Sequence, residues 1–231
     1  MGFLKKFFRN VLHEGAPSIR TSNSFEQLTE EELQAHLGVE RYGKFLLTDA
    51  VRPSYDLQVV PQQGYRRDVY HDQEAGTKIP VLMAAASREV LFDLFMELIE
   101  PLGTEVDVVL ETSHTRDSAG HTDLYREHID VVILQSILWD FEECLLNDGC
   151  AGIAVLNPAR PQEVQFDEHK MLIVYGEPLD QFEAILKNAG IPRDDSMRFI
   201  TEAEHVHSSS DRFAEQFEEL KTRLGMDLNY C

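Results

Sequence analysis

The segment Glu111–Thr122, ETSHTRDSAGHT, contains side chains of the types that bind divalent metal ions. They are Glu111, His114, Asp117 and His121. Imidazole and carboxylate groups suit zinc or manganese. However, the i, i+3, i+7 spacing of His114, Asp117 and His121 gives a common face only on a helix, and a glycine and the lack of apolar side chains indicate a loop. The sequence therefore leaves two interpretations open: a metal site, and a loop that binds no metal.

A second candidate site uses Ser87, Arg88 and Arg116 to bind an anion. Ser87 directly precedes an apolar, helix-like segment and is a typical N-cap residue. Backbone N–H groups at a helix N-terminus attract negative charge, and the two arginines would add to that attraction. The simpler interpretation is an ordinary helix cap beside solvated or ion-paired arginine side chains.

The segment Ile79–Val109 positions both candidate sites. Val81–Ala86 and Glu105–Leu110 are apolar and predict two strands, and the Phe-rich residues between them repeat at helical spacing. A strand–helix–strand unit of about 30 residues favours a parallel pair of neighbouring strands with a right-handed crossover. Ligands bind at the carboxyl ends of such strands, so we expect Ser87 and the Glu111–His121 loop to meet at one edge of the sheet.

The rest of the body predicts more strands and helices. Three further strands are expected at Cys150–Leu156, Glu163–Asp167 and Met171–Tyr175, and three helices at Gln135–Asn147, Leu179–Ala189 and Asp211–Leu224. The connections between these strands are too short for crossovers, so at least one pair must be antiparallel. The predicted fold is α/β, with α+β as the alternative: a mixed parallel and antiparallel sheet with helices on both faces.

Other histidines are weaker candidates for metal ligands. His205 and His207 would point the same way only on a strand, and the neighbouring serines Ser208–Ser210 favour a loop instead. Asp167, Glu168 and His169 are read as a polar turn between two strands. A metal at either place is the less favoured interpretation.

Residues 1–78 are predicted to form an N-terminal helical and irregular arm, and residues 79–231 an acidic α/β domain. Residues 3–12 form a short basic amphipathic helix that suits weak contact with an anionic membrane, a partner protein, or the acidic body of the same chain. Thr29 and Glu32 form a capping box for a helix over Glu30–Leu37. Between residues 42 and 76 the signals are mixed, and an irregular segment is expected.

Charge and composition limit the classes of partner. The formal net charge is −20, and residues 79–231 carry 11 Lys and Arg against 30 Asp and Glu. This acidic field repels phosphate backbones, so nucleic acid is not an expected partner. No apolar run approaches the roughly 20 residues of a transmembrane helix, and no secretory signal is recognised. Three cysteines without paired CxxC spacing favour the cytoplasm.

The sequence lacks the common catalytic motifs. Phosphate-binding, zinc-protease, serine-hydrolase, kinase and paired-cysteine patterns are all missing from it. We therefore expect a non-enzymatic interaction or regulatory protein that binds a protein partner or itself, for example as a homodimer. The alternative is a hydrolase-like enzyme, dependent on a metal or binding a small anion, with its site around Ser87 and the Glu111–His121 loop. No cofactor is identified; a divalent metal belongs only to the alternative.

Overall fold

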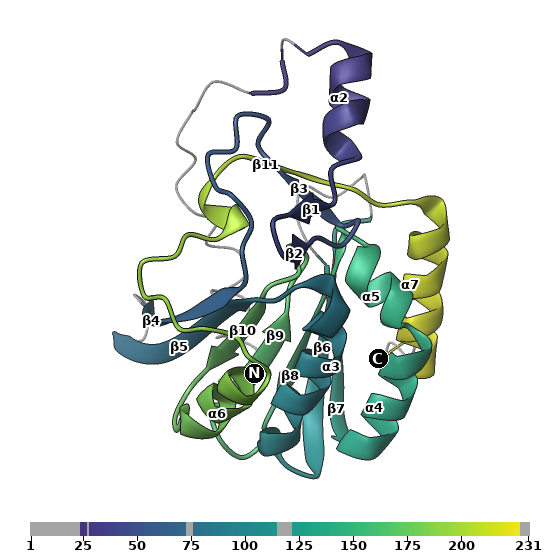
Figure 1. Cartoon of the computed structure of the whole chain (residues 1–231). Coiled ribbons are helices and arrows are strands. Elements are labelled where there is room, and N and C mark those ends of the chain that lie inside the picture. The colour runs from purple at the N-terminus through teal and green to yellow at the C-terminus, as the bar shows by residue number, and fades with distance from the viewer. Residues whose placement is uncertain (1–23, 27, 73–75, 115–121, 227–231) are drawn as a thin grey trace.

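The computed structural model describes residues 24–26, 28–72, 76–114 and 122–226 of the chain. Its main element is a seven-stranded sheet in the order β4-β5-β10-β9-β8-β6-β7 (Figure 1). The strands are β4 (Gly64–Asp72), β5 (Thr77–Ala85), β6 (Glu105–Thr112), β7 (Thr122–Asp130), β8 (Ala151–Leu156), β9 (Glu163–Phe166) and β10 (Leu172–Tyr175).

Every pairing in this sheet is antiparallel, so the predicted mixture of parallel and antiparallel strands is wrong. β5 and β6 do run in the same direction, but β10, β9 and β8 lie between them. The short connections from β8 through β10 make these strands pair with one another and fill the space between β5 and β6. The rule for neighbouring strands joined by a helix therefore does not apply to this pair.

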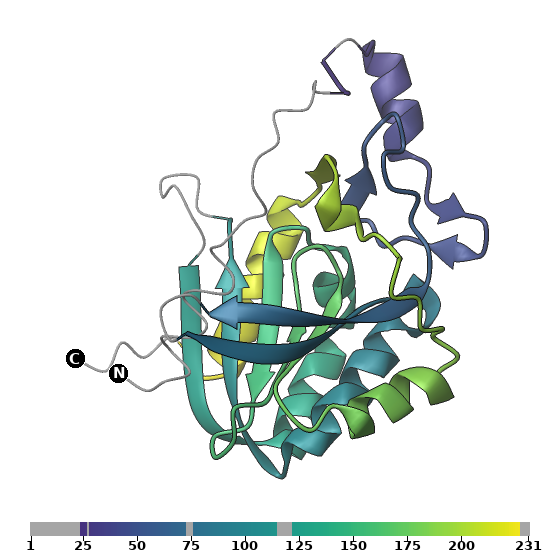
Figure 2. The same cartoon turned by 90° about the vertical axis from the view of Figure 1, so that its left-hand side faces the viewer.

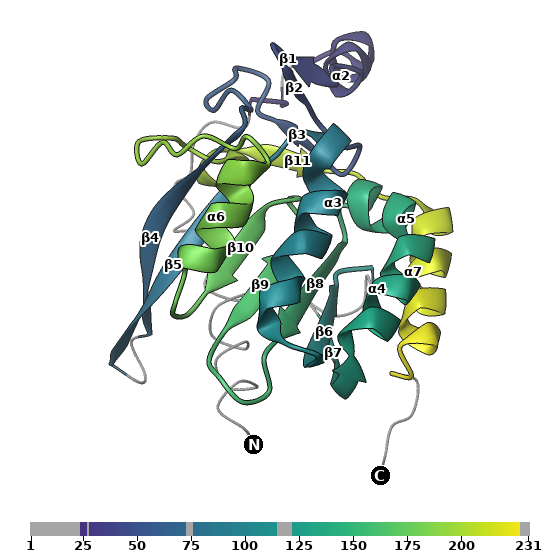
Figure 3. The same cartoon turned by 60° about the horizontal axis from the view of Figure 1, so that its bottom comes forward.

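The helices that pack on this sheet within the described residues lie on one face, which corrects the prediction of helices on both faces (Figure 3). They are α3 (Arg88–Ile99), α4 (Val131–Asp140), α5 (Glu142–Asn147), α6 (Asp180–Asn188) and α7 (Asp211–Arg223), with a 3-10 turn η1 at Glu100–Leu102. The main core lies between these helices and the sheet, where Phe92, Phe95 and Phe166 are almost fully buried. Since the sheet alternates its side chains between two faces, Val81, Ile173 and Tyr175 form a second apolar cluster on the other face.

The described residues between 28 and 63 lie at one end of the sheet (Figure 1). They contain α2 (Glu30–Leu37), β1 (Arg41–Tyr42), β2 (Phe45–Leu46) and β3 (Val51–Pro53). The structure confirms the capping box, because the Thr29 side chain accepts from the Glu32 backbone N–H and the Glu32 carboxylate accepts from the Thr29 backbone N–H. β3 pairs with β11 (His205–His207), which follows a 3-10 turn η2 at Ile200–Glu202.

The expectation of an irregular segment between residues 42 and 76 is wrong for β4. Figure 2 shows β4 and β5 as one long hairpin at the edge of the sheet. The polar residues of β4 misled the prediction, because a strand at a sheet edge can carry charged side chains that find partners outside the core. The proposed boundary between residues 78 and 79 falls inside β5, and the division into domains stays a prediction.

Within the described residues, no helix has the length and apolar character needed to cross a membrane. The predicted amphipathic helix at residues 3–12 lies outside the described residues.

A charged cluster around Glu183 attaches α6 to β4. The carboxylate of Glu183 accepts hydrogen bonds from Arg67 Nη2 at 2.9 Å and from Tyr65 Oη at 3.2 Å, and Lys187 and Arg193 lie within 3.4 Å of it. Glu183 itself is only 7% exposed. The Arg67 guanidinium lowers the pKa of the Glu183 carboxyl to about 2, although burial opposes this shift.

Replacing Glu183 with glutamine is expected to lower the free energy of unfolding at neutral pH by about 2 kcal/mol, as for other charge-assisted hydrogen bonds. Because the folded-state pKa is below the ordinary value of 4.5, the stabilisation is complete above about pH 4.5 and is lost as the pH falls toward 2. Urea denaturation at several pH values measures this effect. The control is Glu215→Gln at an exposed position of α7. Equal stability of E183Q and wild type at pH 7 would contradict the prediction.

Candidate metal centre

Three histidine side chains from two separate segments meet at the end of the sheet next to β3. They are His169, from the turn between β9 and β10, and His205 and His207, from β11. The ring centroids lie 4.7 Å apart for His169 and His207, 4.9 Å for His169 and His205, and 5.1 Å for His205 and His207. One ring nitrogen of each lies within 4.8 Å of the others.

The local structure explains why these rings face one another. His205 and His207 are two residues apart on a strand, so their side chains project from the same face of it. β11 holds this conformation by pairing with β3, in the register His205 to Pro53 and His207 to Val51. His169 lies in a tight turn that Lys170 closes with a left-handed φ of 63°.

The hydrogen bonds of His205 and His207 determine which ring nitrogen is available. Nδ1 of His205 is 2.8 Å from the Ala203 carbonyl oxygen, and Nδ1 of His207 is 2.6 Å from that of Gly149. Because a carbonyl oxygen can only accept, both Nδ1 atoms must carry the proton. In the neutral rings the lone pair is then on Nε2, the atom left for a metal.

The Nδ1 atom of His169 has a carboxylate oxygen as its hydrogen-bond partner instead of a backbone carbonyl oxygen. This Nδ1 lies 3.0 Å from Asp167 Oδ2, and Nε2 of the same ring lies 3.9 Å from Glu168 Oε1. A histidine that donates Nδ1–H to a carboxylate and offers Nε2 to a metal is a common arrangement in zinc proteins. Burial alone would lower the pKa of His169, but the Asp167 carboxylate raises it overall.

The other two rings are held in the neutral form. Burial, and after it the charge of the neighbouring His169, lowers the pKa of His207 to about 4. Burial also lowers the pKa of His205. Both rings are therefore uncharged at neutral pH, which is the state that binds metal.

Glu111, one of the predicted metal ligands, lies beside this centre rather than in it. It pairs with Gly152 of β8, and a Cβ on Gly152 would lie 3.4 Å from the Glu168 backbone nitrogen. Glycine thus lets the turn carrying His169 approach β8 closely. Burial and then the nearby carboxylates, Glu168 first among them, raise the pKa of Glu111 to about 8.

His114 belongs to a separate group near the three histidines. Its Nε2 lies 2.9 Å from Asp148 Oδ2, and its Nδ1 hydrogen-bonds with Thr112 Oγ1 at 2.7 Å. His114, Asp148 and Cys150 also have the side-chain types and spacing for a metal, but both nitrogens of His114 already have partners. Arg116, Asp117 and His121 lie outside the described residues, so the predicted set is not seen together.

Ser87 and Arg88 have protein partners at the start of α3. Ser87 is the N-cap residue, but its hydroxyl donates to Glu89 at 2.8 Å and accepts from the Leu46 N–H at 3.1 Å instead of bonding a helix amide. Arg88 Nη1 lies 3.9 Å from an Asp49 carboxylate oxygen. Ser87 follows β5 and Glu111 is on β6, so three strands separate the two parts of the expected pocket.

Sequence reasoning did not predict the three-histidine centre because its three residues come from two separate segments of the chain. The His-Val-His pattern of β11 alternates as a strand does, yet the serines after it favoured a loop. Nothing in the sequence links it to His169, 36 residues earlier in the chain. Only the distances between the rings in the folded chain show that these side chains converge.

Comparison with protein-family models, with curated proteins and with solved structures found no match to this chain.

Proposed function

We propose that this protein binds a divalent transition metal, zinc by ligand chemistry, through Nε2 of His169, His205 and His207. The observation that carries the proposal is the fixed orientation of the three rings, each with Nδ1 hydrogen-bonded to an oxygen atom. Imidazole suits zinc, the rings of His205 and His207 are neutral, and the restrained orientations of all three rings reduce the free-energy cost of assembling the site.

The ligand number favours a reactive centre over a purely structural one. Structural zinc sites use four protein ligands, whereas catalytic sites use three and keep a position for water. A zinc ion held by the three histidines would lower the pKa of a bound water to about 7 and would so supply hydroxide near neutral pH. The Glu168 carboxylate, 3.9 Å from Nε2 of His169, is placed to accept a proton. A metal-dependent, hydrolase-like activity is the function we propose.

The test is the metal content of the full-length protein. Protein purified without chelator, or reconstituted with zinc sulfate and dialysed, is expected to hold about one zinc ion per chain by elemental analysis. Since ligands that bind only the folded state stabilise it, zinc should also raise the melting temperature. No retained zinc and no change in melting temperature at a hundred-micromolar excess of zinc would overturn the proposal.

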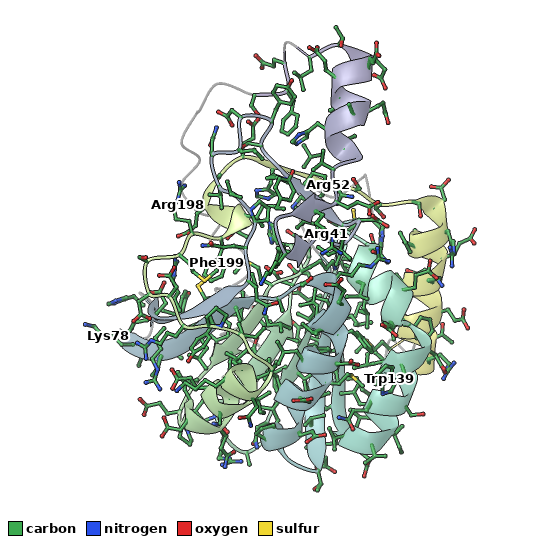
Figure 4. The ribbon with its side chains drawn as sticks, in the orientation of Figure 1. Arg41, Arg52, Lys78, Trp139, Arg198 and Phe199 are labelled. Carbon is green, nitrogen blue, oxygen red and sulfur yellow. The ribbon has the colours of Figure 1, made fainter. Side chains whose placement is uncertain are left out.

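A non-enzymatic interaction protein remains the second candidate, with a second copy of the chain as the partner. Three large apolar side chains of α4 favour it, because Val132 is 67%, Ile133 56% and Trp139 51% exposed. Figure 4 labels Trp139 on this helix. Sedimentation of the wild type against Trp139→Ser tests this candidate. It predicts a concentration-dependent dimer that the substitution weakens, and a wild type that stays monomeric would exclude it.

We also propose a cytoplasmic location and weak membrane contact through residues 3–12. The free thiols of Cys144 and Cys150 support the first, and the basic amphipathic pattern of residues 3–12 supports the second. Fractionation of cells and vesicle co-sedimentation of a variant lacking residues 1–14 test them. A secreted protein, or vesicle binding unchanged by the truncation, would contradict them.

A further inference from the structure

A cavity of about 540 Å³ lies at the end of β9 opposite His169. The described part of its wall comes from β4 and β5, from Pro161 and the start of β9, and from the end of β10 with the two residues that follow it. It opens on the sheet face away from the helices, because Val164, the next residue after Glu163, packs into the helix-covered core. Its volume is within the range of roughly 300–1,000 Å³ found for small-molecule sites.

The wall of this cavity is mainly apolar, with one buried acidic group. Val69, Ile79 and Pro80 provide apolar surface from the β4–β5 hairpin. Tyr175 adds an aromatic ring that is 8% exposed and packs edge-on against Tyr70, with the ring centroids 6.3 Å apart. This surface suits a ligand with an aromatic or aliphatic body.

Among the described residues of the wall, Glu163 is the buried charged group. It is 1% exposed, it lies directly across the strand pair from Tyr175, and its Oε1 accepts a hydrogen bond from Gln165 Nε2. Its Oε2 is buried and has no hydrogen-bond partner. Buried polar atoms without partners are rare because they cost free energy, so an unpaired carboxylate oxygen on a residue that lines a cavity indicates a ligand that donates to it.

The charges around the cavity favour a ligand whose hydrogen-bond donor group is positively charged. Among the described residues of the cavity wall, Glu163 and Glu177 stand against one lysine, Lys78, near the end of the β4–β5 hairpin (Figure 4). Lys78 is exposed to solvent, which screens its charge more than that of a buried group. Burial raises the pKa of Glu163 to about 8, although the hydrogen bond from Gln165 acts in the opposite direction, and a cation bound beside this carboxyl would favour its charged form.

We infer that this cavity binds a small amphipathic amine, whose apolar body packs on Ile79 and Tyr175 and whose ammonium group donates to Glu163 Oε2. A charge-assisted hydrogen bond from the ammonium group satisfies the unpaired oxygen. Removal of the apolar body of the ligand from water also favours binding. The site shares no residue with the three-histidine centre, so it does not depend on the proposed metal function.

The test is calorimetry or amide NMR on the full-length protein with 2-phenylethylamine as the probe. Two related probes separate its parts: 2-phenylethanol keeps the apolar body without the amine, and methylamine keeps the amine without the body. The wild type is expected to bind 2-phenylethylamine at least tenfold more tightly than it binds 2-phenylethanol or methylamine. The first comparison removes one charged hydrogen bond, and the second removes the apolar contact.

Two variants locate the binding. Glu163→Gln keeps the shape of the side chain and should weaken the binding of 2-phenylethylamine at least tenfold. The matched control Glu177→Gln at the rim should change the affinity less than about threefold. Ile79→Trp fills the apolar side of the cavity and should abolish binding without altering Glu163. Equal affinity in wild type and E163Q, or no binding of the amine at millimolar concentration, would overturn the inference.

Discussion

His205→Asn and His207→Asn are each expected to weaken zinc binding by about several hundred-fold. A full set of ligands in a zinc site supplies roughly 10–16 kcal/mol, so one ligand is worth about 3–4 kcal/mol. Asparagine is the informative replacement, since its amide nitrogen can still donate to the carbonyl oxygens of Ala203 or Gly149 but it has no atom at the position of Nε2.

Competition with a fluorescent zinc chelator measures the dissociation constants, and circular dichroism checks that the variants fold. The control is His128→Asn on β7, an exposed histidine bonded to Glu105 at the first residue of β6. The backbone φ of His128 is 56°, a conformation that asparagine tolerates well. Zinc affinity within threefold of the wild type in both β11 variants would show that these rings are not ligands.

Gly149→Ala is expected to lower the free energy of unfolding by about 3 kcal/mol, as an overpacked backbone contact does. A methyl group on Gly149 would overlap the Ala50 carbonyl oxygen and lie 2.8 Å from the Ser208 carbonyl oxygen. The Gly149 N–H donates to Ser208 O, and the Ser208 N–H donates to Ala50 O, both at 2.8 Å. The substitution therefore separates the backbone contacts that hold β11 in place.

The same substitution should weaken zinc binding, because the Gly149 carbonyl orients His207 and loss of such an orienting group costs about 10–100-fold in metal affinity. Denaturant unfolding and the chelator assay measure the two effects. Gly38→Ala is the matched control: Gly38 has a φ of −76°, and a Cβ there would make only ordinary contacts of 3.4 Å or more. If G149A unfolds at the same denaturant concentration as the wild type, the close packing of Gly149 does not contribute to stability.

Local patterns predicted many of the helices and strands because their causes are local. The apolar spacing of Leu91, Phe92 and Phe95 produces α3, and all three side chains are buried. The helix expected over residues 135–147 is present as two helices, α4 and α5, which Phe141 separates. In these segments the same residues that set the local conformation also form the buried face.

Strand pairing was not predictable in the same way. An apolar strand such as β5 can pair with any strand that presents backbone hydrogen-bonding groups, so its sequence does not identify the neighbour. Here β10 occupies the position expected for β6, and the expected pocket between Ser87 and Glu111 is divided by three strands.

The sequence by itself determined where most helices form, which side chains become the core, and that the body is acidic. Those properties follow from spacing and composition along the chain. Only the tertiary structure decided that the sheet is antiparallel, that its helices lie on one face, and that His169 meets His205 and His207. The physical reason is that these contacts join segments distant in sequence, and the backbone hydrogen bonds that bring them together are chemically the same for every residue except proline.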